Sequence, residues 1–146
     1  MKTSLPSFTL PVKREEDRFA CAAEGVRIAR WAGLSDRAQQ EIAIAVAELV
    51  SNAVRHAGGG EIEIRAIRDE GQGAKAKLGV EVIVRDSGPG LDPRIASASE
   101  ESPHSTAPRL PGQGLGIGLG AVHRLMSSVV IRSAPGVSTE IIATKW

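Results

Sequence analysis

Three polar side chains recur at four-residue intervals in an otherwise apolar helical segment. Glu48, Asn52 and His56 lie in "AELVSNAVRHAG" (47–58), with Arg55 beside the last of them. Since residues four apart lie on one face of a helix, they form a polar row next to the apolar stripe. A carboxylate can accept a proton from a hydroxyl or water, and an Asn carbonyl oxygen is a suitable ligand for Mg²⁺. The alternative is an exposed helix face with polar decoration.

A second polar segment, "VRDSGPG" (84–90), ends a stretch of alternating apolar residues. Asp86 closes the predicted strand, and Gly88 and Gly90 flank Pro89. Glycine lets a backbone approach a flat ligand closely, while a carboxylate accepts a hydrogen bond from an exocyclic amine. An adenine fits this description, and so does an ordinary turn, because D-S-G and P-G are common turn sequences.

A third segment, "GQGLGIGLG" (112–120), has glycine at every second position and leads into "AVHRLM". Glycine costs a helix about 1 kcal/mol relative to alanine, so a helix that begins this way needs a compensating reason. Amide groups at a helix N-terminus bind phosphates, and this supplies one. The alternative is a flexible hinge. The segment is not a Walker loop, because G-x-x-x-x-G-K-[ST] is absent, and it is not a dinucleotide fingerprint, because no strand precedes it.

Hydrophobic periodicity predicts the elements that must position these segments. The first strand contains Pro11, which restricts it to an edge of the sheet. A long Ser/Pro/Ala-rich stretch without a period is predicted to be a lid. The predicted order is a strand at 7–12, helices at 15–32 and from Ser35/Asp36 to the glycines at 58–60, strands at 61–67 and 78–85, the lid at 91–113, a helix through about Met126, and strands at 129–133 and 138–146.

Both long helices are expected to bury an apolar stripe. Asp36 and Gln39 stand at the spacing of a capping box at the start of the second helix. The predicted core positions are Phe19, Ala22, Ala23, Val26, Ala29 and Ala32 in the first helix, and Ile42, Ala45, Val46, Leu49 and Ala53 in the second.

Length, charge and cysteine content narrow the classes of protein. A chain of 146 residues suits one domain. The 18 Lys+Arg nearly balance the 17 Asp+Glu, so we expect neither a nucleic-acid partner nor an anionic membrane surface. Cys21 is the only cysteine, which excludes an intramolecular disulfide and a Cys-based zinc site. With no leader peptide or long apolar span in the sequence, the expected location is the cytoplasm.

Together the three segments resemble the GHKL superfamily of ATP-binding domains, which includes gyrase, MutL and histidine kinases. "ELVSNAVRH" resembles its N box, "DSGPG" its first glycine box and "GLGIGLG" its second. The resemblance covers about residues 8–146. It implies an α+β fold, the two-layer α/β sandwich called the Bergerat fold, with a mixed, mostly antiparallel sheet and helices on one face. It also implies a single GHKL domain over 1–146, with 91–113 as the ATP lid.

The resemblance assigns roles to particular residues and implies ATP and Mg²⁺ as cofactors. Glu48 would be the general base, Asn52 the Mg²⁺ ligand and Arg55 a phosphate contact. Asp86 would bind the adenine amine, helped by Thr139 through a water. His56 is expected to have a hydrogen-bonded structural role at the helix end. The remaining nucleotide-binding positions implied by the resemblance are Gly88, Gly90, Ser105, Thr106, Gly114, Leu115, Gly116, Ile117, Gly118 and Leu119.

Among GHKL proteins the chain looks most like the stand-alone serine kinases of bacterial partner-switching pathways. Histidine kinases carry an additional helical hairpin, and their N box usually begins with Asn where this chain has Glu48. The expected activity is therefore a protein serine/threonine kinase close to the stressosome switch kinases (RsbT-like). Its expected substrate is a STAS-domain protein and its output partner a phosphatase or another enzyme. The alternatives are an anti-sigma factor kinase that sequesters a sigma factor, and an ATP-binding docking module without kinase activity.

Overall fold

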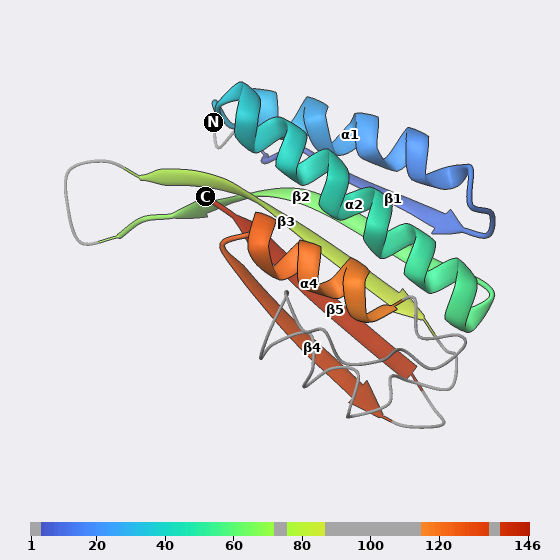
Figure 1. The fold of residues 1–146 in the computed structure, drawn as a ribbon. Helices are drawn as coiled ribbons and strands as arrows, with labels where there is room; N and C mark the ends of the chain where they lie inside the picture. Colours follow the sequence, from blue (N-terminus) through green and yellow to red (C-terminus); the bar gives the residue numbers. More distant parts are fainter. Residues whose placement is uncertain (1–3, 72–75, 87–114, 135–137) are drawn as a thin grey trace.

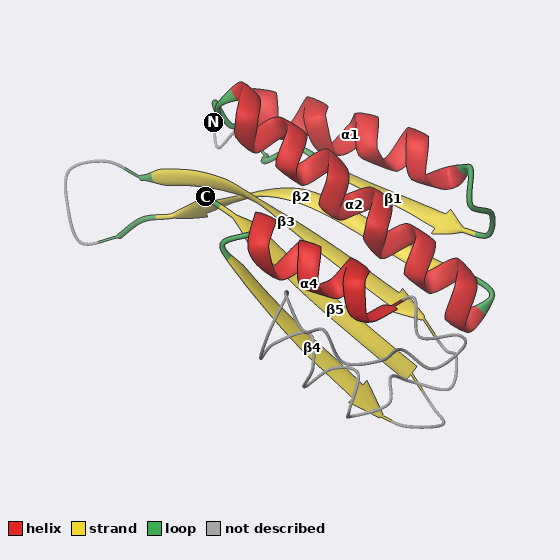
Figure 2. Cartoon of the chain, in the orientation of Figure 1, coloured by secondary structure: helices red, strands yellow, loops and turns green. Residues whose placement is uncertain are grey.

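The computed structural model describes residues 4–71, 76–86, 115–134 and 138–146. Their strands form one five-stranded antiparallel sheet in the order β1-β2-β3-β5-β4. All described helices lie on the same face of this sheet (Figures 1 and 2). The predicted α+β architecture is thus confirmed. The elements are β1 (Ser7–Val12), α1 (Asp17–Trp31), α2 (Asp36–Ala57), β2 (Gly60–Asp69), β3 (Lys77–Asp86), α4 (Leu115–Leu125), β4 (Ser128–Ala134) and β5 (Ser138–Lys145).

The strands bury alternate residues because successive side chains point to opposite faces of a sheet. The helix-covered face carries apolar residues such as Ile64 and Val82, which pair across β2 and β3 and are fully buried. The opposite face carries charged pairs. On that face Arg65 Nε donates a hydrogen bond to Glu81 at 2.8 Å. The alternation read in the sequence therefore assigned each face correctly.

Helix α1 buries a stripe that matches the prediction only in part, since Ala29 is buried as predicted. Phe19 is 64% exposed, with the Arg18 guanidinium 4.7 Å from its ring centroid, and Ala23 is also exposed. The residues that α1 buries are Cys21, Gly25, Ile28 and Ala29. The reason is the close approach of α2, since a Cβ on Gly25 would lie 3.1 Å from the Ile42 side chain. The buried face of α1 is therefore set by the small Gly25 at the contact with α2, and not by the more apolar Phe19.

Helix α2 has the predicted core stripe, with Ile42, Val46 and Leu49 fully buried. Its start at Ser35/Asp36 is also confirmed, but the predicted cap is not. Ser35 is the N-cap and accepts a hydrogen bond from the Ala38 amide at 3.1 Å, so the proposed capping box beginning at Asp36 is wrong. Ser35 is the cap because a residue with extended backbone just before the first turn can accept a hydrogen bond from a backbone amide that has no partner within the helix. At the other end Gly58 adopts φ +72 and terminates the helix as predicted.

Strand β1 lies at an edge of the described sheet, as Pro11 indicated, and α4 ends at Leu125 close to the predicted end. The predicted lid at 91–113 lies outside the described residues. Within the parts of the chain that the structure describes, no helix is long and apolar enough to cross a membrane.

Candidate functional site

Three elements that carry the sequence motifs meet at one end of the sheet. The C-terminal half of α2, the C-terminal end of β3 and the N-terminal end of α4 lie at the same end in Figure 1. Helix α2 packs against both β3 and α4. The fold thus brings the N box, the first residue of the first glycine box and the helix of the second glycine box to one place.

The polar row on α2 contains a buried amide and a carboxylate that has no hydrogen-bond or ion-pair partner among the described residues. Asn52 is only 6% exposed, and its Nδ2 has no hydrogen-bond acceptor among the described residues. One turn earlier, Glu48 is partly buried and makes no hydrogen bond or ion pair with the described part of the chain. A buried amide donor without a partner costs about 1–3 kcal/mol. With respect to the described residues, the row therefore has polar atoms that a ligand could engage.

Arg55 lies beside this row and contacts a residue that sequence analysis had not singled out. Its Nε donates to Glu15 Oε1 at 2.9 Å, and its side chain is 59% exposed. Ser51, one turn earlier on α2, donates from its hydroxyl to Glu15 Oε2 at 2.6 Å. The pKa of Glu15 is lowered, first by the Ser51 hydroxyl and then by the nearby arginines Arg55 and Arg18. No local pattern could have indicated this contact, because Glu15 and Ser51 are 36 residues apart.

His56 ends the polar row, and its surroundings favour the neutral imidazole. Its pKa is lowered from 6.5, mainly by burial and secondly by the Arg55 charge, while the Asp86 carboxylate acts in the opposite direction. Helix α2 packs against β3, although their residues are far apart in sequence.

A row of polar residues crosses the sheet next to this end of α2. Asp86 on β3 pairs with Thr139 on β5, which in turn pairs with Ser133 on β4. Thr139 is 4% exposed, and its hydroxyl lies 3.4 Å from the Ser133 hydroxyl. By strand alternation Asp86 shares the helix-covered face with the buried Val84 and Val82. The structure thus brings together Asp86 and Thr139, the two residues that the resemblance implied for adenine.

Two glycines allow the strands next to Asp86 to pack closely. A Cβ on Gly60 would lie 2.2 Å from the Arg85 carbonyl oxygen and 3.1 Å from Asp86 Cβ, and one on Gly59 would lie 2.4 Å from the Val12 carbonyl oxygen. In the sequence these glycines indicated only the end of α2. Their additional role, the close packing of β2 against β3 and β1, depends on strand pairing.

The second glycine box lies at the start of α4. The helix includes Leu115, Gly116, Ile117 and Gly118 in its first turn. Leu119 is fully buried in the hydrophobic core, so its side chain is not available to a nucleotide. The other predicted nucleotide-binding positions lie outside the described residues: Gly88, Gly90, Ser105, Thr106 and Gly114.

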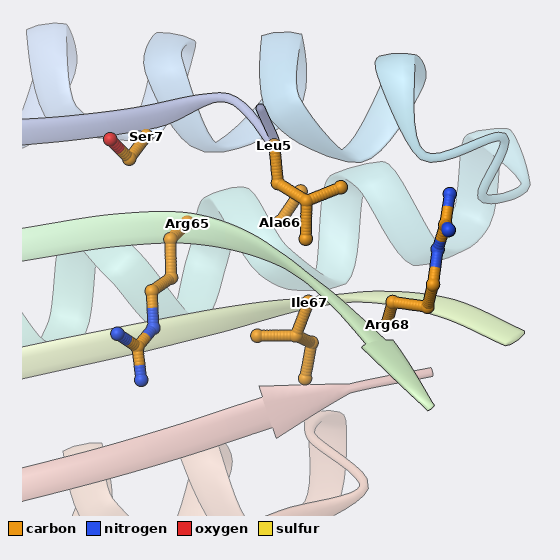
Figure 3. A pocket seen from close by; sticks show the side chains of 6 residues that line it. All are labelled: Leu5, Ser7, Arg65, Ala66, Ile67 and Arg68. Atoms are coloured by element: carbon orange, nitrogen blue, oxygen red, sulfur yellow. The ribbon is translucent and has the colours of Figure 1, made fainter. Parts of the chain in front are cut away.

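A surface pocket lies elsewhere, near the start of β1 (Figure 3). Ser7 pairs with Arg65 there, whereas Val12, at the other end of β1, pairs with Gly60 beside Asp86. In Figure 3 the side chains of Arg65 and Arg68 point in different directions, so they do not converge on one ligand. The pocket is lined by Leu5, Ser7, Arg65, Ala66, Ile67 and Arg68.

The described residues contain no group of three or more His, Cys, Asp or Glu side chains that could hold a metal ion by themselves. A cation at the α2 row would find further ligands in a bound molecule and in water. Mg²⁺ commonly binds in this manner, through few protein oxygens together with phosphate oxygens.

Comparison with known proteins agrees with this arrangement. Residues 17–145 match the family described as "Histidine kinase-like ATPase domain". No curated protein sequence matches the chain.

Among solved structures, full-length ShkA in complex with AMPPNP is similar with a TM-score of 0.53 and 22% identity, over 99% of this chain and 31% of ShkA. The chain therefore spans about a third of ShkA, and at this identity the likeness concerns the fold alone. The catalytic domain of histidine kinase ThkA has a TM-score of 0.45 and 16% identity, over 98% of this chain and 95% of that domain. The mycobacterial sensor histidine kinase MprB has a TM-score of 0.45 and 17% identity, over 96% of this chain and 99% of the MprB chain.

Proposed function

Because the chain belongs to the histidine kinase-like ATPase domain family, we propose that it binds ATP and transfers the γ-phosphoryl group to a protein serine or threonine. We further propose that it acts in a bacterial partner-switching pathway of the RsbT-like type. The observation that carries the proposal is the Glu48 carboxylate, which has no hydrogen-bond or ion-pair partner among the described residues and stands one helical turn from the buried Asn52. A general base must be available in this way to accept a proton.

ATP is the proposed nucleotide on two grounds. The fold neighbour ShkA was solved with AMPPNP, an ATP analogue. In this chain the paired residues Asp86 and Thr139 offer a carboxylate and a hydroxyl side by side on the helix-covered face. A carboxylate at this place would accept a hydrogen bond from the adenine amine, and the buried Thr139 hydroxyl would take part through a water.

The α2 row fits a magnesium ion bound together with the phosphates. Asn52 supplies an amide oxygen, a ligand type that Mg²⁺ accepts, and its Nδ2 is a buried donor that a phosphate oxygen or a coordinated water would satisfy. When bound, Mg²⁺ neutralises charge that develops on the phosphates. The residues present therefore fit the group, and we propose Asn52 as its protein ligand.

The proposed reaction uses Glu48 as base and Arg55 as a charge partner. The serine or threonine hydroxyl oxygen attacks the γ-phosphorus, the new O–P bond forms, and the bond from that phosphorus to the β-γ bridging oxygen breaks to leave ADP. Glu48 takes the hydroxyl proton. Arg55 would contact the phosphates and so counter the negative charge. A hydroxyl nucleophile needs this base because it must lose its proton as it attacks.

We propose a STAS-domain protein as the substrate and a phosphatase or another output enzyme as the partner of the free kinase, with the cytoplasm as the location. The support is the likeness of the sequence motifs to the RsbT-like group. An anti-sigma factor kinase remains a second proposal on the same motifs, and it predicts co-purification with a sigma factor.

The test is a phosphotransfer assay with γ-labelled ATP, Mg²⁺ and purified STAS-domain proteins. We expect acid-stable label on serine or threonine of the STAS protein. Glu48→Gln should abolish transfer while ATP binding persists, and Glu16→Gln, at an exposed position outside α2, should change neither. Acid-labile label on histidine would contradict the serine kinase proposal, and ATP binding without transfer to any STAS protein would favour the docking module.

A further inference from the structure

We propose that Glu15 is a positioning residue that holds the Arg55 guanidinium toward the phosphates of the bound nucleotide. The inference rests on the proposed function, because it takes ATP as the ligand. Glu15 belongs to none of the three motifs. It lies in the turn between β1 and α1, and its carboxylate reaches across to two residues of α2, Ser51 and Arg55.

The Glu15 carboxylate is itself held in place. Ser51 donates to Oε2 at 2.6 Å, Arg18 Nη1 donates to the same oxygen at 2.9 Å, and Arg55 Nε donates to Oε1 at 2.9 Å. Ser51 is 6% exposed, so this end of the contact is anchored inside the protein. A carboxylate with several donors has little rotational freedom, and it can therefore orient the next group in the chain of contacts.

The turn that carries Glu15 is also braced. Asp17 Oδ2 accepts hydrogen bonds from the backbone amides of Lys13 and Arg14, at 2.8 and 3.0 Å. These bonds fix the chain just before α1. The carboxylate is thus presented by a rigid backbone and does not depend on a free loop.

Arg55 keeps donors for a second anion. Glu15 is its hydrogen-bonding partner within the described residues, and a guanidinium has more N–H donors than one carboxylate can accept. Ser51 and Arg55 are four residues apart, so the contact runs along the side of α2 next to the row of Glu48 and Asn52. An arginine anchored there at one edge can offer its other edge to a phosphate beside the proposed magnesium ligand.

The test compares the affinities for two ligands, ATP and adenosine, which differ only in the triphosphate group. Isothermal calorimetry with Mg²⁺ is run with ATP and with adenosine on the full chain, the Glu15→Ala variant and the Arg55→Met variant. An unanchored arginine must be ordered on binding, so Glu15→Ala should weaken ATP binding roughly two- to tenfold. Adenosine binding should not change. In the Arg55→Met background, Glu15→Ala should have no further effect on ATP.

Glu16→Ala is the matched control. Glu16 is exposed and adjacent, and its side chain makes no hydrogen bond or ion pair with the described residues, so its removal deletes the same charge without touching α2. We expect Glu16→Ala to leave ATP affinity unchanged or slightly higher. If Glu15→Ala fails to fold, Ser51→Ala keeps the charge, loosens the carboxylate, and should produce a smaller loss of ATP affinity in the same direction.

Two failures are distinguishable. If the full chain binds neither ATP nor adenosine, the proposed function fails. If it binds ATP, but Glu15→Ala binds ATP as tightly as Glu16→Ala does, or the loss persists without Arg55, the positioning role of Glu15 is overturned while the proposed function stands.

Discussion

The replacement of Asn52 by leucine should stabilise the nucleotide-free protein and weaken its binding of magnesium-ATP. Asn52 is 6% exposed, and its Nδ2 finds no acceptor in the described part of the chain. Leucine has the same branched shape without polar atoms, so Asn52→Leu removes a burial penalty of about 1–3 kcal/mol. For a domain of this size the melting temperature should rise by about 3–10 °C.

The same substitution removes the proposed magnesium ligand. Affinity for ATP in the presence of Mg²⁺ should fall roughly tenfold or more, while adenosine binding persists. Thermal denaturation without nucleotide and calorimetry with both ligands measure the two effects. Stability and binding should therefore change in opposite directions.

Gln39→Leu is the control for this prediction. Gln39 is also buried, at 7% exposure, but its Nε2 donates to the Leu34 carbonyl at 3.0 Å. Its loss leaves that carbonyl without its donor, so Gln39→Leu should lower the melting temperature. A lower melting temperature for Asn52→Leu as well would show that the Asn52 amide is satisfied within the protein, and this would refute the reasoning.

Three further predictions concern the surroundings of the site. Gly60→Ala should destabilise the protein by about 3 kcal/mol or more in urea denaturation, because the new methyl group meets the Arg85 backbone oxygen. Gly33→Ala, at φ +78 with open space around it, should cost only about 1 kcal/mol, and equal costs would contradict the packing argument. The Cys21 thiol is buried and its pKa is raised to about 11, so iodoacetamide at about pH 8 should modify it only after unfolding. The pKa of His56 is lowered from 6.5 in the folded protein, so the His56 imidazole binds a proton more readily in the unfolded chain. The contribution of His56 to the stability of the fold is therefore complete above pH 6.5 and is lost as the pH falls below that value. His56→Gln should therefore flatten the decline in melting temperature between about pH 7 and about pH 5, and an unchanged pH profile would exclude this role.

Much of the fold followed from local sequence patterns. The stripe of Ile42, Val46 and Leu49 and the alternation in β2 and β3 predicted the elements, since both periods come from backbone geometry within a few residues. The face of α1 was predicted only in part: Ala29 is buried as predicted, but Gly25, not Phe19, meets α2. Hydrophobicity alone does not show where a neighbouring helix comes so close that only glycine, which has no side chain, fits at the contact.

The candidate site divides in the same way. The row of Glu48, Asn52 and His56 was visible in the sequence, because four-residue spacing puts side chains on one face of any helix. Tertiary structure alone decided that Asp86 pairs with Thr139 and that Glu15 reaches Ser51, since strand register and the packing of a turn against α2 join residues far apart in the chain. Such contacts depend on how whole elements pack, and no local pattern encodes them.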